Sequence, residues 1–78
     1  MERIKLIWDF RGPMAAKTAE HHVIHLKEFA QMEGLDLEPI EFVVQSEMAA
    51  MAFLVCTREQ MIPLRDRLRP HRGELYSA

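Results

Sequence analysis

Hydrophobic and polar side chains alternate along residues 3–10, which is the pattern of a β-strand with one buried face. Successive side chains of a strand point to opposite sides, so every second residue shares a face. One face carries four large apolar side chains, Ile4, Leu6, Trp8 and Phe10. The other face carries Arg3, Lys5, Ile7 and Asp9. The first set is therefore expected to face a hydrophobic core.

The chain then changes to a helical period. Gly12-Pro13 ends the extended run, and neither glycine nor proline recurs before Gly34. The pattern predicts an amphipathic helix from Pro13 to Gly34, with Gly34 left-handed at its end. Apolar residues spaced by three and four positions form its core face, namely Ala16, Ala19, Val23, Leu26 and Ala30. The border of this face carries Ala15, His22 and Phe29.

A second strand is predicted over residues 37–45, where the alternation returns with Ile40, Phe42 and Val44 on one face. Pro39 has no N–H to donate to a neighbouring strand. This strand should therefore lie at the edge of a sheet or begin irregularly.

The run from Ala49 to Thr57 is apolar on both faces, unlike the two earlier strands. Its alternate residues are Ala50, Ala52, Leu54 and Cys56 on one side and Met51, Phe53 and Val55 on the other. Such a strand belongs in the interior of a sheet that is covered on both sides. A buried helix is the alternative, but the β-favouring residues from Phe53 onward indicate a strand.

Thr57 and Gln60 have the spacing of a capping box, which predicts the start of a second helix. Pro63 either kinks this helix or marks where it properly begins. Arg72-Gly73 is predicted to be a turn. Residues 74–77 form either a short final strand or a tail.

The predicted order is β-α-β-β-α, with or without a final strand. A right-handed crossover followed by a hairpin places the third strand between the first two. The expected fold is α+β, a two-layer sandwich of helices on an antiparallel-dominated sheet. In this element order the chain resembles small ferredoxin-like domains of the dimeric α/β-barrel type. The resemblance implies a habit of dimerising and of holding small ligands between sheet and helices, but no particular chemistry.

The length of 78 residues fits a single domain, 1–78. A domain of this size buries only about 60% of its unfolded surface and is marginal alone. Its only cysteine, Cys56, excludes a disulfide within the chain. We therefore expect a homodimer, with an apolar patch that includes Ile7, Val43 and one side of the third strand as its interface.

The net charge is only −2, which argues against a nucleic-acid partner. No signal-peptide pattern opens the chain, and no apolar stretch approaches the ~20 residues that span a membrane. These features indicate a cytoplasmic protein with no membrane association.

Three histidines lie on the first helix. His21, His25 and Glu28 fall on one face of it, and a His/His/Glu set can bind zinc. The spacing resembles the zincin helix, but His22 stands where that helix carries its catalytic glutamate. We prefer a solvated helix face as the interpretation, because short motifs often match by chance.

His22 borders the core and can act as an acid or base near neutral pH. Asp9 leaves the first strand just before the helix, so we expect it to orient His22 if the histidine is catalytic. The alternative is a hydrogen-bonded structural histidine, which we favour. In either case His22 should be less exposed than His21 and His25.

Arginines gather on one border of the second helix. Arg65 and Arg69, with Arg58 before them, could hold a carboxylate or phosphate. Pairing with the acids that dominate residues 20–47 is the alternative that we prefer. Trp8 could stack on a ligand, although its position suits the core.

Three functions follow from these observations. The first is a homodimeric ligand-binding or interaction domain with no catalysis of its own. The second is a small enzyme that uses His22 and Asp9. The third is a metal-binding module built from His21, His25 and Glu28.

Overall fold

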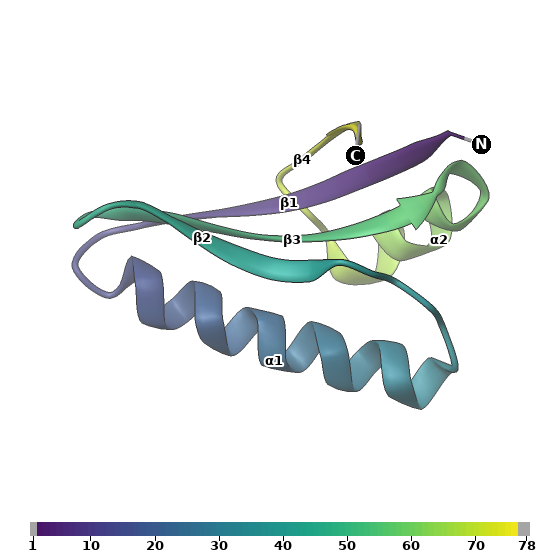
Figure 1. The fold of residues 1–78 in the computed structure, drawn as a ribbon, viewed down its shortest axis with the longest axis horizontal. Helices are drawn as coiled ribbons and strands as arrows, with labels where there is room; N and C mark the ends of the chain where they lie inside the picture. Colours follow the sequence, from purple (N-terminus) through teal and green to yellow (C-terminus); the bar gives the residue numbers. More distant parts are fainter. Residues whose placement is uncertain (1, 77–78) are drawn as a thin grey trace.

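The computed structural model describes residues 2–76 and shows an α+β fold with one antiparallel sheet and two helices (Figure 1). The elements in chain order are β1 (Arg3–Arg11), α1 (Ala15–Glu33), β2 (Ile40–Ser46), β3 (Ala49–Thr57), α2 (Arg58–Leu68) and β4 (Arg72–Leu75). The predicted order of elements is confirmed, and of the two alternatives left open for the last segment, a strand and a tail, the structure shows the strand. The turn predicted at Arg72-Gly73 is wrong, because these residues pair with β1 as the start of β4. Ser77, in the predicted final segment, lies outside the described residues.

The strands are ordered β2-β3-β1-β4, and all neighbouring pairs are antiparallel. The third strand therefore lies between the first two, as the sequence predicts. Leu54 of β3 pairs with Leu6 of β1 on one side and with Ile40 of β2 on the other. This arrangement is compatible with a ferredoxin-like fold.

Both helices cover the same face of the sheet, and the main core lies between them and the sheet (Figure 1). Small side chains let α1 lie close: Ala19 of the helix and Ala50 and Ala52 of β3 are fully buried. The predicted core face of α1 is confirmed apart from its first position. Ala15 is buried there and Ala16 is only half-buried, because the chain bends at Gly12 and brings the first residue of α1 against the sheet.

The outer face of the sheet carries a second, smaller apolar cluster. Ile7 and Val55 are 0% exposed there. Tyr76 packs against this cluster, and the Lys5 ammonium lies 4.3 Å from the centre of the Phe53 ring. The expected apolar patch is therefore wrong at Ile7 and on β3, which the chain's own long side chains cover, whereas Val43, opposite Met51 on the same face, stays 41% exposed.

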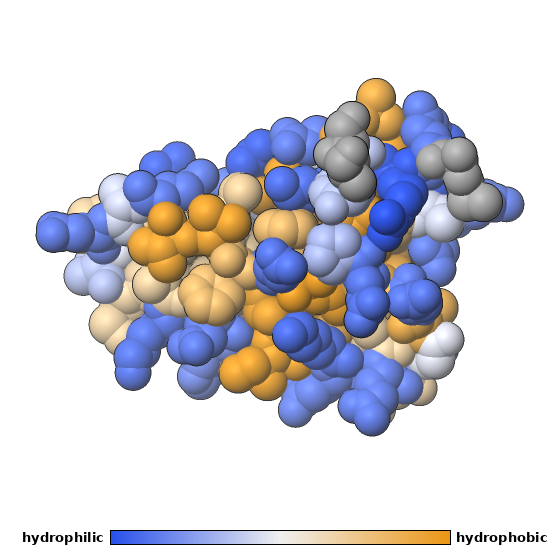
Figure 2. Space-filling model, in the orientation of Figure 1, coloured by the Kyte–Doolittle hydropathy of each residue, from blue (hydrophilic) through white to orange (hydrophobic). Residues whose placement is uncertain are grey.

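The edge strand β2 is far more exposed than its alternating pattern predicts. Only Ile40 is buried in it, whereas Phe42, Val43 and Val44 are 37%, 41% and 53% exposed. Figure 2 views the molecule from this side and shows apolar side chains over β2 and again over α1. An edge strand has a neighbour on one side only, so its side chains lack half of the usual cover.

The C-terminal end of α1 and the start of α2 follow the sequence closely, whereas α1 begins at Ala15 and not at the predicted Pro13. Gly34 is left-handed (φ 66°), and the N–H of Leu35 donates to the Ala30 carbonyl at 2.9 Å. Before α2, the N–H of Gln60 donates to Thr57 Oγ1 at 3.2 Å, and the N–H of Thr57 donates to Gln60 Oε1 at 2.9 Å. The capping box is thus complete, and α2 continues through Pro63. Within residues 2–76, neither helix combines the length and apolar character needed to cross a membrane.

The capping box gives a test of what holds α2 in place. We expect Thr57→Ala to lower the free energy of unfolding by about 1 kcal/mol, because it leaves the first turn of α2 without its side-chain acceptor. Thr18→Ala is the matched control, since Thr18 is an exposed helical threonine whose hydroxyl donates to the Met14 carbonyl. Its effect should stay within about 0.5 kcal/mol in urea unfolding. Equal losses for the two variants would contradict the capping role.

Candidate ligand-binding site

A groove of about 440 Å³ lies where β1, α2 and β4 meet. This volume falls within the range of about 300–1,000 Å³ typical of small-molecule sites. The groove is lined by Ile4, Leu6, Arg58, Met61, Arg65, Pro70, His71, Arg72, Gly73, Glu74 and Leu75. We call it the α2–β4 groove.

The floor of the α2–β4 groove is apolar. Ile4 and Leu6 come from the core face of β1, and Met61 comes from α2. Gly73 pairs with Leu6 across the β1–β4 ladder. A Cβ at Gly73 would lie 3.4 Å from Leu6 Cδ2, so the glycine leaves the space above Leu6 open.

Three arginines are among the residues that line the groove. Arg58 forms an ion pair with Glu2, whereas Arg72 lies opposite Ile7 in the ladder, so its side chain is bound to Asp9 and Glu74 on the outer face of the sheet. Among the described residues, Arg65 has only a 3.5 Å contact with its neighbour Asp66, and both side chains are largely exposed. Among the arginines that line the groove, Arg65 therefore has the weakest ion pair with a carboxylate of the chain itself.

Asp9 is held by the chain that follows α2. Arg72 donates from Nε to Asp9 Oδ2 at 2.9 Å and from its terminal nitrogen to Oδ1 at 3.2 Å. These charge-assisted bonds hold the pKa of Asp9 below its usual value and raise the pKa of Arg72. The backbone N–H of Asp9 donates to His71 Nδ1 at 2.8 Å. Because Nδ1 accepts this bond, a neutral His71 carries its proton on Nε2, where it can donate to a ligand.

His22 lies apart from Asp9, in an aromatic cluster on the helix side of the sheet. Its ring centroid is 4.7 Å from that of Trp8 and 5.6 Å from that of Phe10. Burial lowers the pKa of His22, and the nearby His25 and His71 lower it further. As expected, His22 is less exposed than His21 and His25.

The structure does not bring Asp9 and His22 together as the predicted acid–base pair. The Asp9 carboxylate is bound by Arg72, and the buried Nε2 of His22 has no hydrogen-bond partner among the described residues. The reason is the alternation of β1: Trp8 and Phe10 face the helices, so Asp9 between them faces the opposite side.

Two of the three residues predicted to bind a ligand lie outside the α2–β4 groove. Trp8 is 4% exposed, and its indole N–H donates to the Leu68 carbonyl at 3.1 Å, so the ring anchors the end of α2. Arg69 adopts a left-handed conformation (φ 51°) at the end of α2 and does not line the groove. Arg65 alone is placed at the rim.

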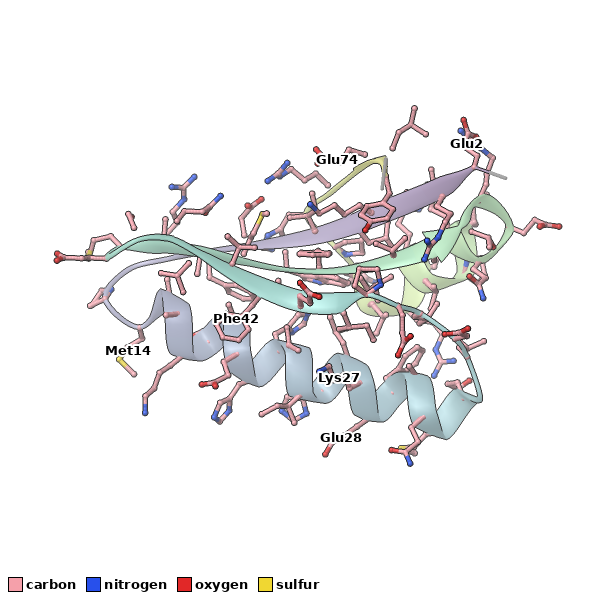
Figure 3. All side chains as sticks on the ribbon, viewed as in Figure 1. Glu2, Met14, Lys27, Glu28, Phe42 and Glu74 are labelled. Carbon is pink, nitrogen blue, oxygen red and sulfur yellow. The ribbon has the colours of Figure 1, made fainter. Side chains whose placement is uncertain are left out.

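The proposed metal ligands lie on the exposed face of α1. His25 Nδ1 is 3.5 Å from Glu28 Oε1, and Glu28 points away from the sheet (Figure 3). Across residues 2–76, no cluster of three or more His, Cys, Asp or Glu side chains has the arrangement of a metal site. His21 and His25 are both exposed, as a solvated helix face requires.

Among the described residues, neither Arg58 nor Arg65 pairs with an acid of residues 20–47, since Arg58 contacts Glu2 and Arg65 contacts Asp66. A pair of the expected kind forms on another arginine, between the two helices. Arg67 donates to Glu33 at 3.1 Å, and its guanidinium lies 4.8 Å from the centre of the Phe29 ring. This pair lies outside the α2–β4 groove, so it does not compete for Arg65.

His71, Met61 and Gly73 contribute to the groove but were not predicted as site residues. The sequence signal was present in part, because His71 and Arg72 directly follow the arginine-rich helix. The pattern placed Gly73 in a turn, whereas Gly73 lies in β4 and pairs with Leu6. Because His71 directly precedes β4, this pairing brings His71 into the groove beside α2.

No protein-family model matches the chain, and neither the curated proteins nor the solved structures contain a significant match.

The surroundings of His22 predict a pH dependence. Because the pKa of His22 is lower in the folded state, the unfolded chain binds its proton first as the pH falls. Stability should therefore decline as the pH drops below ~6.5, the ordinary histidine pKa. His22→Phe should reduce this loss between pH 7 and pH 5 in urea unfolding.

The control for this prediction is His21→Phe, at an exposed position on the same helix. It should leave the slope of stability against pH as it is in the unmodified chain. A slope that responds to His21→Phe and not to His22→Phe would contradict the assignment.

Proposed function

We propose that this chain is a homodimeric domain that binds a small organic anion in the α2–β4 groove and has no catalysis of its own. The observation that carries the proposal is the placement of Arg65 and His71 at the rim of an apolar floor. Pockets of this kind, with an apolar lining and a few convergent polar groups, are typical of small-molecule sites.

The charge of the rim favours a ligand with one negative group. The Arg58 charge is balanced by Glu2, and Arg72 is balanced by Asp9 and Glu74. Arg65 has only its weak, exposed contact with Asp66. A carboxylate or singly charged phosphate ester would meet the Arg65 guanidinium, and a neutral His71 would add a second donor through Nε2.

The floor of the groove favours an apolar body behind that anionic group. Ile4, Leu6 and Met61 offer hydrocarbon surface, and Gly73 leaves room above Leu6. Removing apolar ligand surface from water is the main source of affinity in such a site. The ligand class is therefore an amphipathic monoanion.

A binding role is also consistent with where the titratable groups lie. Asp9 is bound by Arg72, and His22 is packed among aromatic rings on the other side of β1. His71 lines the groove, but its Nδ1 is occupied by the N–H of Asp9. A general base needs an unoccupied acceptor within reach of its proton.

The homodimer, of ferredoxin-like type, is supported by size and surface. The chain has the element order of that fold, and 78 residues form a small core. Apolar side chains remain exposed on β2 even though the outer face is covered over Ile7 and Val55. Contiguous exposed apolar surface usually marks an interface.

Binding can be tested with sodium octanoate as a probe of the ligand class and octanol as its uncharged control. In an NMR titration, octanoate should shift the amide signals of Arg65 and Gly73, and octanol should bind more weakly. Arg65→Ala should weaken octanoate binding by about tenfold or more, because it removes the charged donor.

Arg69→Gly is the matched control, since it removes the same charge from a position outside the groove and suits its left-handed backbone. It should leave octanoate affinity unchanged. Equal affinity of the unmodified chain for octanoate and octanol would overturn the proposed anion site.

The homodimer has its own measurement. Light scattering on the unmodified chain at micromolar concentration should give about twice the monomer mass of 9.1 kDa. A monomer mass there would contradict the dimer and leave the proposed ligand site standing, because all residues of the groove come from one chain.

A further inference from the structure

The pairing of β2 with β3 determines which backbone groups of β2 remain open. The N–H of Val55 donates to the Pro39 carbonyl at 3.2 Å, so residue 39 is directed toward β3. Backbone direction alternates along an antiparallel strand. The N–H and C=O groups of Ile40, Phe42 and Val44 are therefore directed away from β3, at the open edge of the sheet.

The two edges of the sheet differ in how well they are protected. β4 is short and carries Arg72 and Glu74, features that keep an edge from pairing with other chains. The open part of β2 carries one charge, Glu41, and three exposed apolar side chains, Phe42, Val43 and Val44. Pro39 precedes it, and an irregularity between Val44 and Ser46 ends its regular pairing. The open edge thus consists of residues 40–44.

We propose that this edge pairs antiparallel with the same edge of a second copy, about a two-fold axis at Phe42. Phe42 would lie opposite Phe42 of the second copy, and Ile40 opposite Val44. In this register every outward N–H and C=O of Ile40, Phe42 and Val44 finds a partner. The inference rests on the homodimer proposed above and names its surface.

The side chains of the strand are self-complementary in this register. Two aromatic rings meet at the axis, flanked by aliphatic pairs, and such cross-strand pairs stabilise a sheet. In this register Glu41 would lie opposite Val43 of the second copy. A register centred on Glu41 would instead place two carboxylates opposite each other. A register centred on Val43 would place Ile40 opposite Ser46, beyond the irregularity in β2.

The neighbouring flank of α1 fits the same surface. Lys27 lines a depression together with Ile40, so this flank of the helix faces the β2 edge. In Figure 3, the Phe42 side chain lies on the α1 side of β2. Ile24 lies three residues before Lys27 on the helix and is 49% exposed. Across the proposed axis it would approach the helix of the second copy and lose water contact.

A substitution at the edge tests the surface. Val44→Lys places an ammonium against Ile40 of the second copy, so the dimer dissociation constant should rise at least about tenfold. Ile62→Lys is the matched control, because Ile62 on α2 is also 53% exposed but lies on another element. It should leave the dimer intact. Light scattering over a dilution series gives both constants, and circular dichroism checks that each variant is folded.

A crosslink tests the register and does not depend on how well Val44→Lys folds. Directly opposed residues of a hydrogen-bonded antiparallel pair have Cα atoms about 5.5 Å apart, which suits a disulfide. Phe42→Cys should therefore form a disulfide-linked dimer under mild oxidation, whereas Ile62→Cys should not. The unmodified chain should stay uncrosslinked because Cys56 is buried.

Each outcome decides between the proposals. A dimer that survives Val44→Lys, or Phe42→Cys that crosslinks no faster than Ile62→Cys, would overturn the β2 surface and leave the homodimer standing. A monomeric unmodified chain would overturn both. Dissociation by Val44→Lys alone, together with rapid crosslinking of Phe42→Cys, is the expected result.

Discussion

β3 is buried on both faces, and its two faces are covered by different means. On the helix side, small residues such as Ala50 and Ala52 bring α1 close, and Leu54 fills the centre of the core. On the outer side, Phe53 and Val55 are covered by side chains of the sheet itself. A strand with this need for cover has to sit inside the sheet, with β1 and β2 as its neighbours. The positions of both edges follow from that requirement.

The groove and the exposed apolar side chains therefore lie at the two edges of the sheet. At the β4 edge, a short strand with a glycine leaves a groove between the sheet and α2. At the β2 edge, a longer strand exposes apolar side chains and unpaired backbone. The centre of the sheet is devoted to packing, since Trp8 and His22, which looked like candidates for chemistry, contact each other there. Function in so small a domain is thus expected at its margins.

Most of the fold could be predicted because its signals are local. The alternation of residues 3–10, the spacing of Val23, Leu26 and Ala30, and the two-sided character of β3 each report burial through periodicity. The site was harder because it depends on how distant segments meet. Residue type and spacing pointed equally to Trp8, Arg65 and Arg69, of which only Arg65 lines the groove. The alternation of β1 already places Asp9 on the face away from His22. Its partner Arg72 could not be predicted, because the four residues of β4 give too short a pattern to identify.

The predicted outer patch failed for a related reason. Periodicity places Ile7 on the outer face, and it does lie there. Periodicity does not show that Met51 and Tyr76 pack against this face, or that the Lys5 ammonium lies over the Phe53 ring. Long side chains decide the exposure of a sheet face, and their directions depend on cross-strand neighbours. Val44 shares a face with the buried Ile40, but it stays 53% exposed because its strand lies at the edge of the sheet.

The positions of the groove and the proposed pairing edge limit how they can influence each other. β1 and β3 lie between them in the sheet order, and the groove includes no residue of β2. Ligand binding and dimerisation can change each other's affinity only if the chain has two conformations and each of the two events favours one conformation over the other. The groove and the β2 edge share no residue and are separated by two packed strands, so we expect each copy to bind its ligand independently. Pairing through β2 would then place the two grooves at the far ends of one continuous sheet. In that arrangement the dimer gains affinity only for a partner that displays two ligands at that spacing.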